Sequence, residues 1–131
     1  MARLLAMTCL LLMLLPVSAS SHAVAEVRIE MTEFEFRPAT VRIPVGRPVR
    51  LIFRNRGQIA HQFETGYLRK TWVRMTSESV YVETNGLDFM GVQPGAWGRL
   101  EFMPRRTGRF AFLCTIEGHQ EAGMQGVLEV R

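Results

Sequence analysis

One short stretch near the C-terminus, residues 114–124, constrains this 131-residue chain more than any other. It contains Cys114, His119 and Met124 in the order Cys-x4-His-x4-Met, and one further histidine, His61, lies far upstream. A thiolate, two imidazoles and a weak axial thioether are the ligands that a blue-copper electron-transfer centre needs. These four residues are therefore the candidate metal ligands, and they predict one copper ion per chain.

The rest of the sequence offers few competing ligands. Without its first two dozen residues, the chain keeps two histidines, His61 and His119, and one cysteine, Cys114. The proposed site uses all three. Zinc and iron–sulfur sites that are built on thiolates usually need several cysteines, so the composition disfavours both.

The N-terminus, residues 1–25, has the pattern of a secretory signal peptide. A basic start precedes an apolar run that ends near Val17, and small residues follow. Cleavage after Ala19 and cleavage after Ala25 both fit this pattern. The apolar run is short and is interrupted by Pro16, so we expect no stable membrane insertion after cleavage; an uncleaved anchor is the alternative. We therefore expect a periplasmic protein whose one remaining cysteine has no internal disulfide partner.

From residue 26 onward, the chain reads as β-structure. Apolar and polar residues alternate in short stretches, and turn sequences such as Asn55-Arg56-Gly57 and Asn85-Gly86 separate several of them. About seven or eight short strands of this kind predict one all-β domain, an antiparallel β-sandwich over residues 26–131. His61 and Phe63 share parity, so both are expected to face the core if residues 60–65 form a strand.

Residues 66–94 fit this pattern least well. Leu68, Trp72 and Met75 have helical spacing, so we expect an irregular, partly helical excursion within this segment. Met75 and Met90 are alternative copper ligands. Packing is the preferred interpretation of both, because methionine commonly fills irregular gaps.

Two stretches resemble the cupredoxins, small blue copper proteins of the plastocyanin, azurin and rusticyanin type. One runs from Phe110 to Gly126 and the other from Asn55 to Phe63. The resemblance implies a Greek-key sandwich and a type 1 copper ion. It also implies one-electron transfer, with His119 near the surface as the electron exit. The loop is similar, too, to that of bacterial periplasmic cupredoxins associated with copper handling.

The same resemblance suggests alternative functions, and the chain differs from the family pattern at one position. A copper-binding protein for storage, delivery or resistance would use the same four ligands. An enzyme is not expected, because multicopper oxidases and copper nitrite reductases need further histidine clusters and domains. Apolar Ile116, Ala122 and Met124 are expected to form a contact patch around the exit. Many family members have asparagine after the first copper histidine, whereas this chain has Gln62.

The chain has a formal net charge of +4, carried mainly by arginine, with Arg105, Arg106 and Arg109 close together. Nucleic-acid binding is not expected in an exported chain without a recognised binding module. A basic surface is suited to steering an acidic redox partner. The expected partners are a redox protein or a copper donor or acceptor, and the expected state is a monomer.

Overall fold

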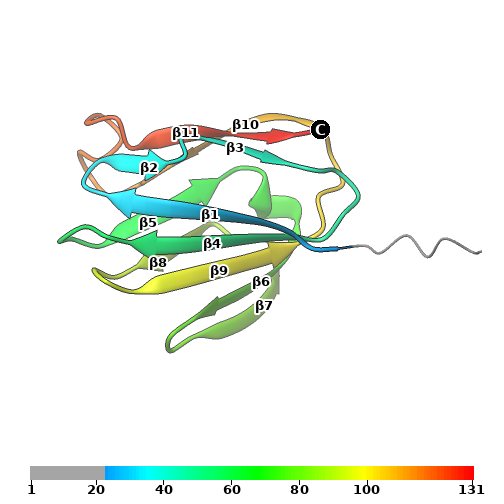
Figure 1. Ribbon diagram of the computed structural model, residues 1–131, viewed down its shortest axis with the longest axis horizontal. Coiled ribbons are helices and arrows are strands. Elements are labelled where there is room, and N and C mark those ends of the chain that lie inside the picture. Colours follow the sequence, from blue (N-terminus) through cyan, green and yellow to red (C-terminus); the bar gives the residue numbers. More distant parts are fainter. Residues whose placement is uncertain (1–22) are drawn as a thin grey trace, which may run out of the picture.

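The structure is a computed structural model that describes residues 23–131. Two β-sheets pack face to face (Figure 1). One has six strands in the order β2-β1-β4-β9-β6-β7, and the other has five in the order β3-β11-β10-β5-β8. Most of the predicted signal peptide lies outside the described residues. In the described part, no helix is long and apolar enough to cross a membrane.

The strands are short, and one 3-10 turn interrupts them. Their bounds are β1 (Ala25–Thr32), β2 (Glu35–Arg37), β3 (Thr40–Ile43), β4 (Val49–Asn55), β5 (His61–Thr65), the 3-10 turn η1 (Leu68–Lys70), β6 (Trp72–Ser77), β7 (Tyr81–Asn85), β8 (Phe89–Val92), β9 (Trp97–Phe102), β10 (Gly108–Leu113) and β11 (Gln125–Val130).

The predicted β-sandwich is confirmed, and its core follows from alternation along the strands. In β4, Val49, Leu51 and Phe53 are buried, whereas the residues between them are more exposed. Phe53, Phe63 and Phe112 pack together across the two sheets, with ring centroids 4.6 Å apart for Phe53–Phe63 and 5.2 Å apart for Phe63–Phe112. The alternation buries one face of each sheet against the other.

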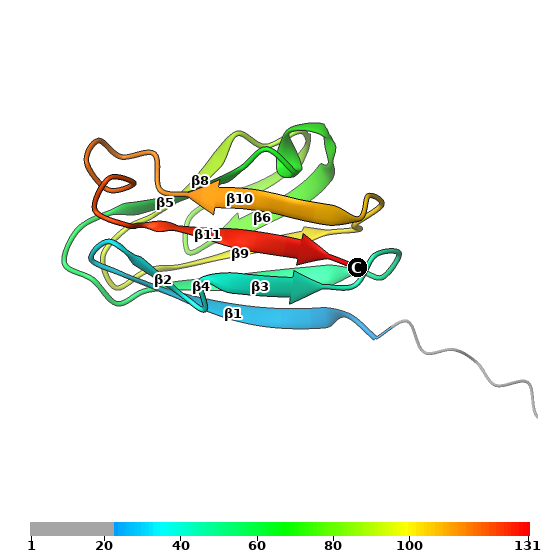
Figure 2. The ribbon, with the colours of Figure 1, turned by 90° about the horizontal axis from the view of Figure 1, so that it is seen from above.

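The sheets are mixed, whereas the sequence predicted antiparallel ones. β1 pairs with β4 in parallel and β3 pairs with β11 in parallel, while the other pairs are antiparallel. Parallel neighbours need a connection that leaves the sheet between them. The chain meets this need by passing from β2 into the other sheet as β3 before it returns as β4 (Figure 2).

Residues 66–94 contain three strands, β6, β7 and β8, and the helical part of the predicted excursion is limited to the 3-10 turn η1. The expected helical stripe is wrong. Leu68 is buried, but Trp72 is 51% exposed, and it is Val73 that enters the core. β6 pairs with β7 on one side and with β9 on the other. This pairing outweighs a helical pattern that rests on only three apolar residues.

One end of the sandwich gathers the segments that matter for the site. β5 begins there at His61, β10 ends there, and the β10–β11 loop covers it. The turn between β1 and β2 lies at the same end (Figures 1 and 2). The fold therefore brings residue 61 to the loop that begins at Cys114.

Candidate metal centre

His61 is placed by the alternation of β5. It is the first residue of that strand, and its side chain is fully buried on the same side as Phe63, as predicted. The adjacent β10 ends at Leu113, so Cys114 is the first residue of the loop and is also fully buried.

The loop after Cys114 is closed by its own backbone. The Cys114 amide donates to the Met124 carbonyl (3.0 Å), and the Met124 amide donates to the His119 carbonyl (3.0 Å). Gly118 and Gly123 have φ of 81° and 106°, a left-handed conformation that glycine adopts at little cost. The loop thus returns on itself and holds His119 over Cys114.

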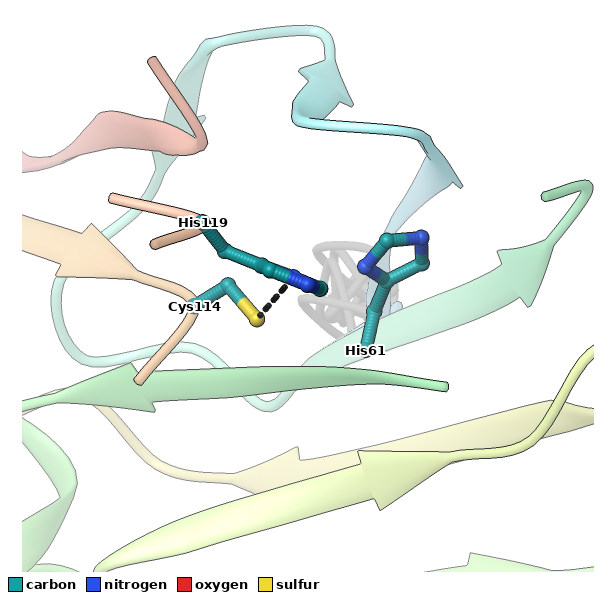
Figure 3. Close-up of side chains that lie close together, drawn as sticks. All are labelled: His61, Cys114 and His119. Carbon is teal, nitrogen blue, oxygen red and sulfur yellow. Dashed lines mark hydrogen bonds between the residues drawn. The ribbon is translucent and has the colours of Figure 1, made fainter. Parts of the chain in front are cut away.

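Three candidate ligands meet at one point. The ligand atoms of His61, Cys114 and His119 all lie within 4.8 Å of one another (Figure 3). The Cys114 Sγ is 3.3 Å from His119 Nδ1, and the two imidazole centroids are 5.2 Å apart. A thiolate and two imidazoles at this separation can share one soft or borderline metal ion.

The environment of His61 is suited to a metal ligand. Within residues 23–131, neither Nδ1 nor Nε2 of this buried ring has a hydrogen-bond partner. An unpaired buried polar group costs about 1–3 kcal/mol, which coordination of an ion would offset. Burial lowers the pKa of His61, and the charge of His119 lowers it further. Both effects favour the neutral imidazole, which is the form that binds metals.

The thiol has one backbone donor. The Gln62 amide donates to Cys114 Sγ at 3.3 Å. The Gln62 side chain, which replaces the asparagine common in the resembling family, accepts a hydrogen bond from the Thr115 hydroxyl. The glutamine therefore still ties the strand of His61 to the cysteine loop. Donors of this kind orient ligands and tune a metal centre.

Asn55 fastens the segment that leads to His61. It is fully buried, and its Nδ2 donates to the Ile59 carbonyl (2.8 Å) and to the Val92 carbonyl (2.9 Å). Its Oδ1 accepts from the Gly57 amide (2.9 Å). The sequence marked Asn55 only as part of a turn, because its partners depend on tertiary structure.

Two residues of the β1–β2 turn were not predicted to lie near the site. The Glu33 carboxylate accepts a hydrogen bond from the Gln58 amide, and this backbone donor is the main reason why the pKa of Glu33 is lowered. The Phe34 ring lies edge-on to His119, with centroids 5.1 Å apart. Phe34 has φ of 63°, a left-handed conformation that costs a non-glycine residue roughly 1–2 kcal/mol.

The predicted contact patch needs correction. Met124 is fully buried and belongs to the interior, so it offers no surface to a partner. His119 is only 6% exposed. Ala122 is exposed as predicted, and Phe34 and Ile59 are the large apolar side chains exposed on neighbouring segments, each at 41%.

The two methionines considered as alternative ligands pack within the sheets. Met90 is buried in β8, where its Sδ lies so close to Gly98 that a Cβ there would approach it to 2.7 Å. Met75 is half-buried in β6, opposite Leu100 of β9. Both positions fit the packing interpretation.

A family model and known proteins resemble this chain. A family model described as a cupredoxin-like domain matches residues 4–85. The copper-resistant cuproprotein CopI of Rubrivivax gelatinosus is 31% identical over an alignment of 115 residues, and the match covers 86% of this chain and 70% of that protein.

Solved structures show the same fold. Auracyanin B superposes with a TM-score of 0.59 at 21% identity, over 82% of this chain and 88% of that one. A multicopper oxidase from Campylobacter jejuni gives a TM-score of 0.62 at 18% identity, over 81% of this chain, but this chain spans only 30% of the oxidase. With the family model and the CopI relative, these likenesses lead to one conclusion: this chain belongs to the cupredoxin family and is a copper-binding protein.

Proposed function

We propose that this chain is an exported blue-copper protein that carries single electrons by cycling one type 1 copper ion between Cu(II) and Cu(I). His61, Cys114 and His119 would hold the ion, and Met124 would be its weak fourth ligand. The observation that supports this most is the buried cluster of one thiol and two imidazoles, in which neither nitrogen of His61 has a hydrogen-bond partner among residues 23–131.

The residues around the site suit electron transfer. When bound, copper supplies the one-electron chemistry. Buried His61 and Cys114 exclude water, and the Gln62 amide donates to the sulfur. Two packed sheets and the closed β10–β11 loop resist movement of the ligands, so little reorganisation would accompany a change of charge. His119 is the one imidazole of the pair with any exposure, which makes its edge the proposed electron exit.

A second function has support from the relative. The CopI protein is named as copper-resistant, so copper storage, delivery or resistance is the alternative role for the same site. Rapid electron exchange with a redox protein would favour the carrier role. Transfer of copper itself to an acceptor would favour copper handling.

We further propose that the chain is a periplasmic monomer and not an enzyme. The family also contains enzyme domains, but this chain spans only 30% of the oxidase it resembles. Within the described residues, the ligand cluster uses both histidines and the free cysteine, so a second copper site of the same kind has no ligands left. The expected partner is a redox protein, or a copper donor or acceptor.

Replacing Met124 with leucine is expected to keep copper bound and to raise the reduction potential. A weak thioether contributes less bonding than the thiolate and imidazoles, and its loss disfavours Cu(II). Voltammetry and copper analysis of the purified variant measure both effects. Loss of copper or a lower potential would contradict the assignment. If Met75→Leu or Met90→Leu shifted the spectrum instead, the fourth ligand would have to be sought there.

Replacing Ala122 with glutamate is expected to slow electron exchange with a redox partner and to leave the visible spectrum nearly intact. Ala122 has no side-chain ligand to lose, but a charge on this exposed loop adds a desolvation cost to docking. Stopped-flow kinetics measure the exchange. Thr107→Glu, which adds the same charge just before β10 at the other end of that strand, is the control and is expected to have a smaller effect.

Copper transfer to a chelator, measured on the same Ala122→Glu protein, separates the two roles. Slower electron exchange with unchanged copper transfer supports the carrier. Unchanged electron exchange with impaired delivery to a protein acceptor would favour copper handling.

A further inference from the structure

The β1–β2 turn places an aromatic ring on the one ligand that solvent reaches. His61, Cys114 and Met124 are 0% exposed, whereas His119 is 6% exposed. The Phe34 ring meets the His119 ring edge-on, with an interplanar angle of 86°. Phe34 is itself 41% exposed, so the side chain that contacts His119 also faces the solvent, and it belongs to neither the core nor the ligand set.

The conformation of Phe34 is unusual. Among residues 23–131 it is the only non-glycine residue with a positive φ. A bulky side chain rarely adopts this region, and glycine would adopt it freely. Strained residues of this kind persist where the surroundings hold them in place, and they gather at functional sites. The turn therefore keeps a phenylalanine where backbone geometry alone favours glycine.

Hydrogen bonds connect this part of the chain to the segment that precedes His61, the other imidazole. The Glu33 carboxylate accepts from the Gln58 amide, and the Arg56 amide donates to the Met31 carbonyl (2.8 Å). The first bond joins the β1–β2 turn to the β4–β5 loop, and the second joins the end of β1 to the same loop, which runs into His61. One turn thus contacts the segments that carry both imidazoles.

We propose that Phe34 is a gate that controls how fast copper enters and leaves the site. This proposal rests on the copper site proposed above. An acceptor must bring its own donor atom to the metal, and of the four proposed ligands only His119 has any exposure. The Phe34 ring must therefore move off His119 before a ligand of the acceptor replaces a ligand of the protein. The exchange changes no oxidation state, and the four protein ligands are the same with the gate present or absent.

The test measures copper release from the mature protein loaded with Cu(I) under ascorbate, with bicinchoninate in excess as the acceptor. Phe34→Gly removes the ring and suits the left-handed backbone, so it is expected to release copper roughly tenfold faster, the upper range for one aromatic contact. Phe34→Tyr keeps the ring and is expected to stay within about twofold of the wild type. Phe89→Ala removes another exposed phenylalanine, 49% exposed in β8, and is expected to change nothing.

Two further measurements distinguish a gate from a structural role of Phe34. The oxidised Phe34→Gly protein is expected to keep its visible spectrum, and the free energy of unfolding of its metal-free form is expected to be unchanged or higher. Release at the wild-type rate would overturn the gate. Equal acceleration by Phe89→Ala, or acceleration only with a lower unfolding free energy, would overturn it in favour of a structural role. If the wild type showed no thiolate-to-copper colour, the copper site itself would fail, and the gate with it.

Discussion

Replacing Cys114 with serine is expected to abolish the strong visible absorption of the copper-loaded protein. That absorption requires charge transfer from a thiolate to Cu(II), and Cys114 is the one free cysteine in the described part of the chain. Serine has nearly the same size and keeps a polar atom at the position, but its hydroxyl is not ionised at neutral pH. Titration with Cu(II) followed by visible spectroscopy measures the effect.

The control for this variant is Thr115→Ser, next to Cys114. It keeps the hydroxyl that donates to Gln62 and is expected to keep the colour. An intense blue or green colour in Cys114→Ser would remove the cysteine from the centre. Retained copper without the colour is compatible with the assignment, because two imidazoles still bind the ion.

Replacing Asn55 with alanine is expected to lower the free energy of unfolding by roughly 3 kcal/mol. The buried amide makes three hydrogen bonds, each worth about 1 kcal/mol, and its removal leaves buried groups without that partner. The lost bonds hold the β4–β5 loop and β8 together next to His61. Denaturation of the metal-free protein by urea measures the change.

Asn85→Ala provides the matched control for Asn55→Ala. Asn85 is exposed at the end of β7, and its replacement is expected to change stability by less than about 0.5 kcal/mol. A similar, small effect at both positions would contradict the role given to Asn55. A large effect at Asn55 alone would show that the scaffold before His61 depends on this buried side chain.

The sequence predicted well those features that depend on local alternation. Apolar parity placed His61 and Phe63 on the buried face of β5, and both are buried there. Phe112 and Cys114, which are also two residues apart, are likewise both buried. A period of two residues fixes the face of a strand without knowledge of its neighbours, so these predictions needed no tertiary information.

Predictions that depended on strand pairing were less successful. The spacing of Leu68, Trp72 and Met75 indicated a helix, but β6 forms because β7 and β9 are available on its two sides. The parallel pairs arise because the chain changes sheets between β2 and β3, and alternation contains no information on that step. Similarly, Met124 was expected at the surface, but the returning loop buries it.

The contacts of the β1–β2 turn could not be predicted from the sequence. Glu33 and Phe34 belong to a charged, aromatic segment with no ligand motif, and their partners Gln58 and His119 are distant in the chain. A positive φ at a phenylalanine has no sequence signature, because propensity favours glycine or asparagine in that conformation. Only the folded arrangement identifies this turn as part of the site.

The most direct test of the proposed centre is to add Cu(II) to the purified mature protein and to record its visible and electron paramagnetic resonance spectra. We predict one copper per chain, an intense thiolate-to-copper absorption and the small copper hyperfine splitting of a type 1 centre. Weak absorption with the large hyperfine splitting of copper bound only by nitrogen and oxygen would contradict the account, as would a stoichiometry other than one.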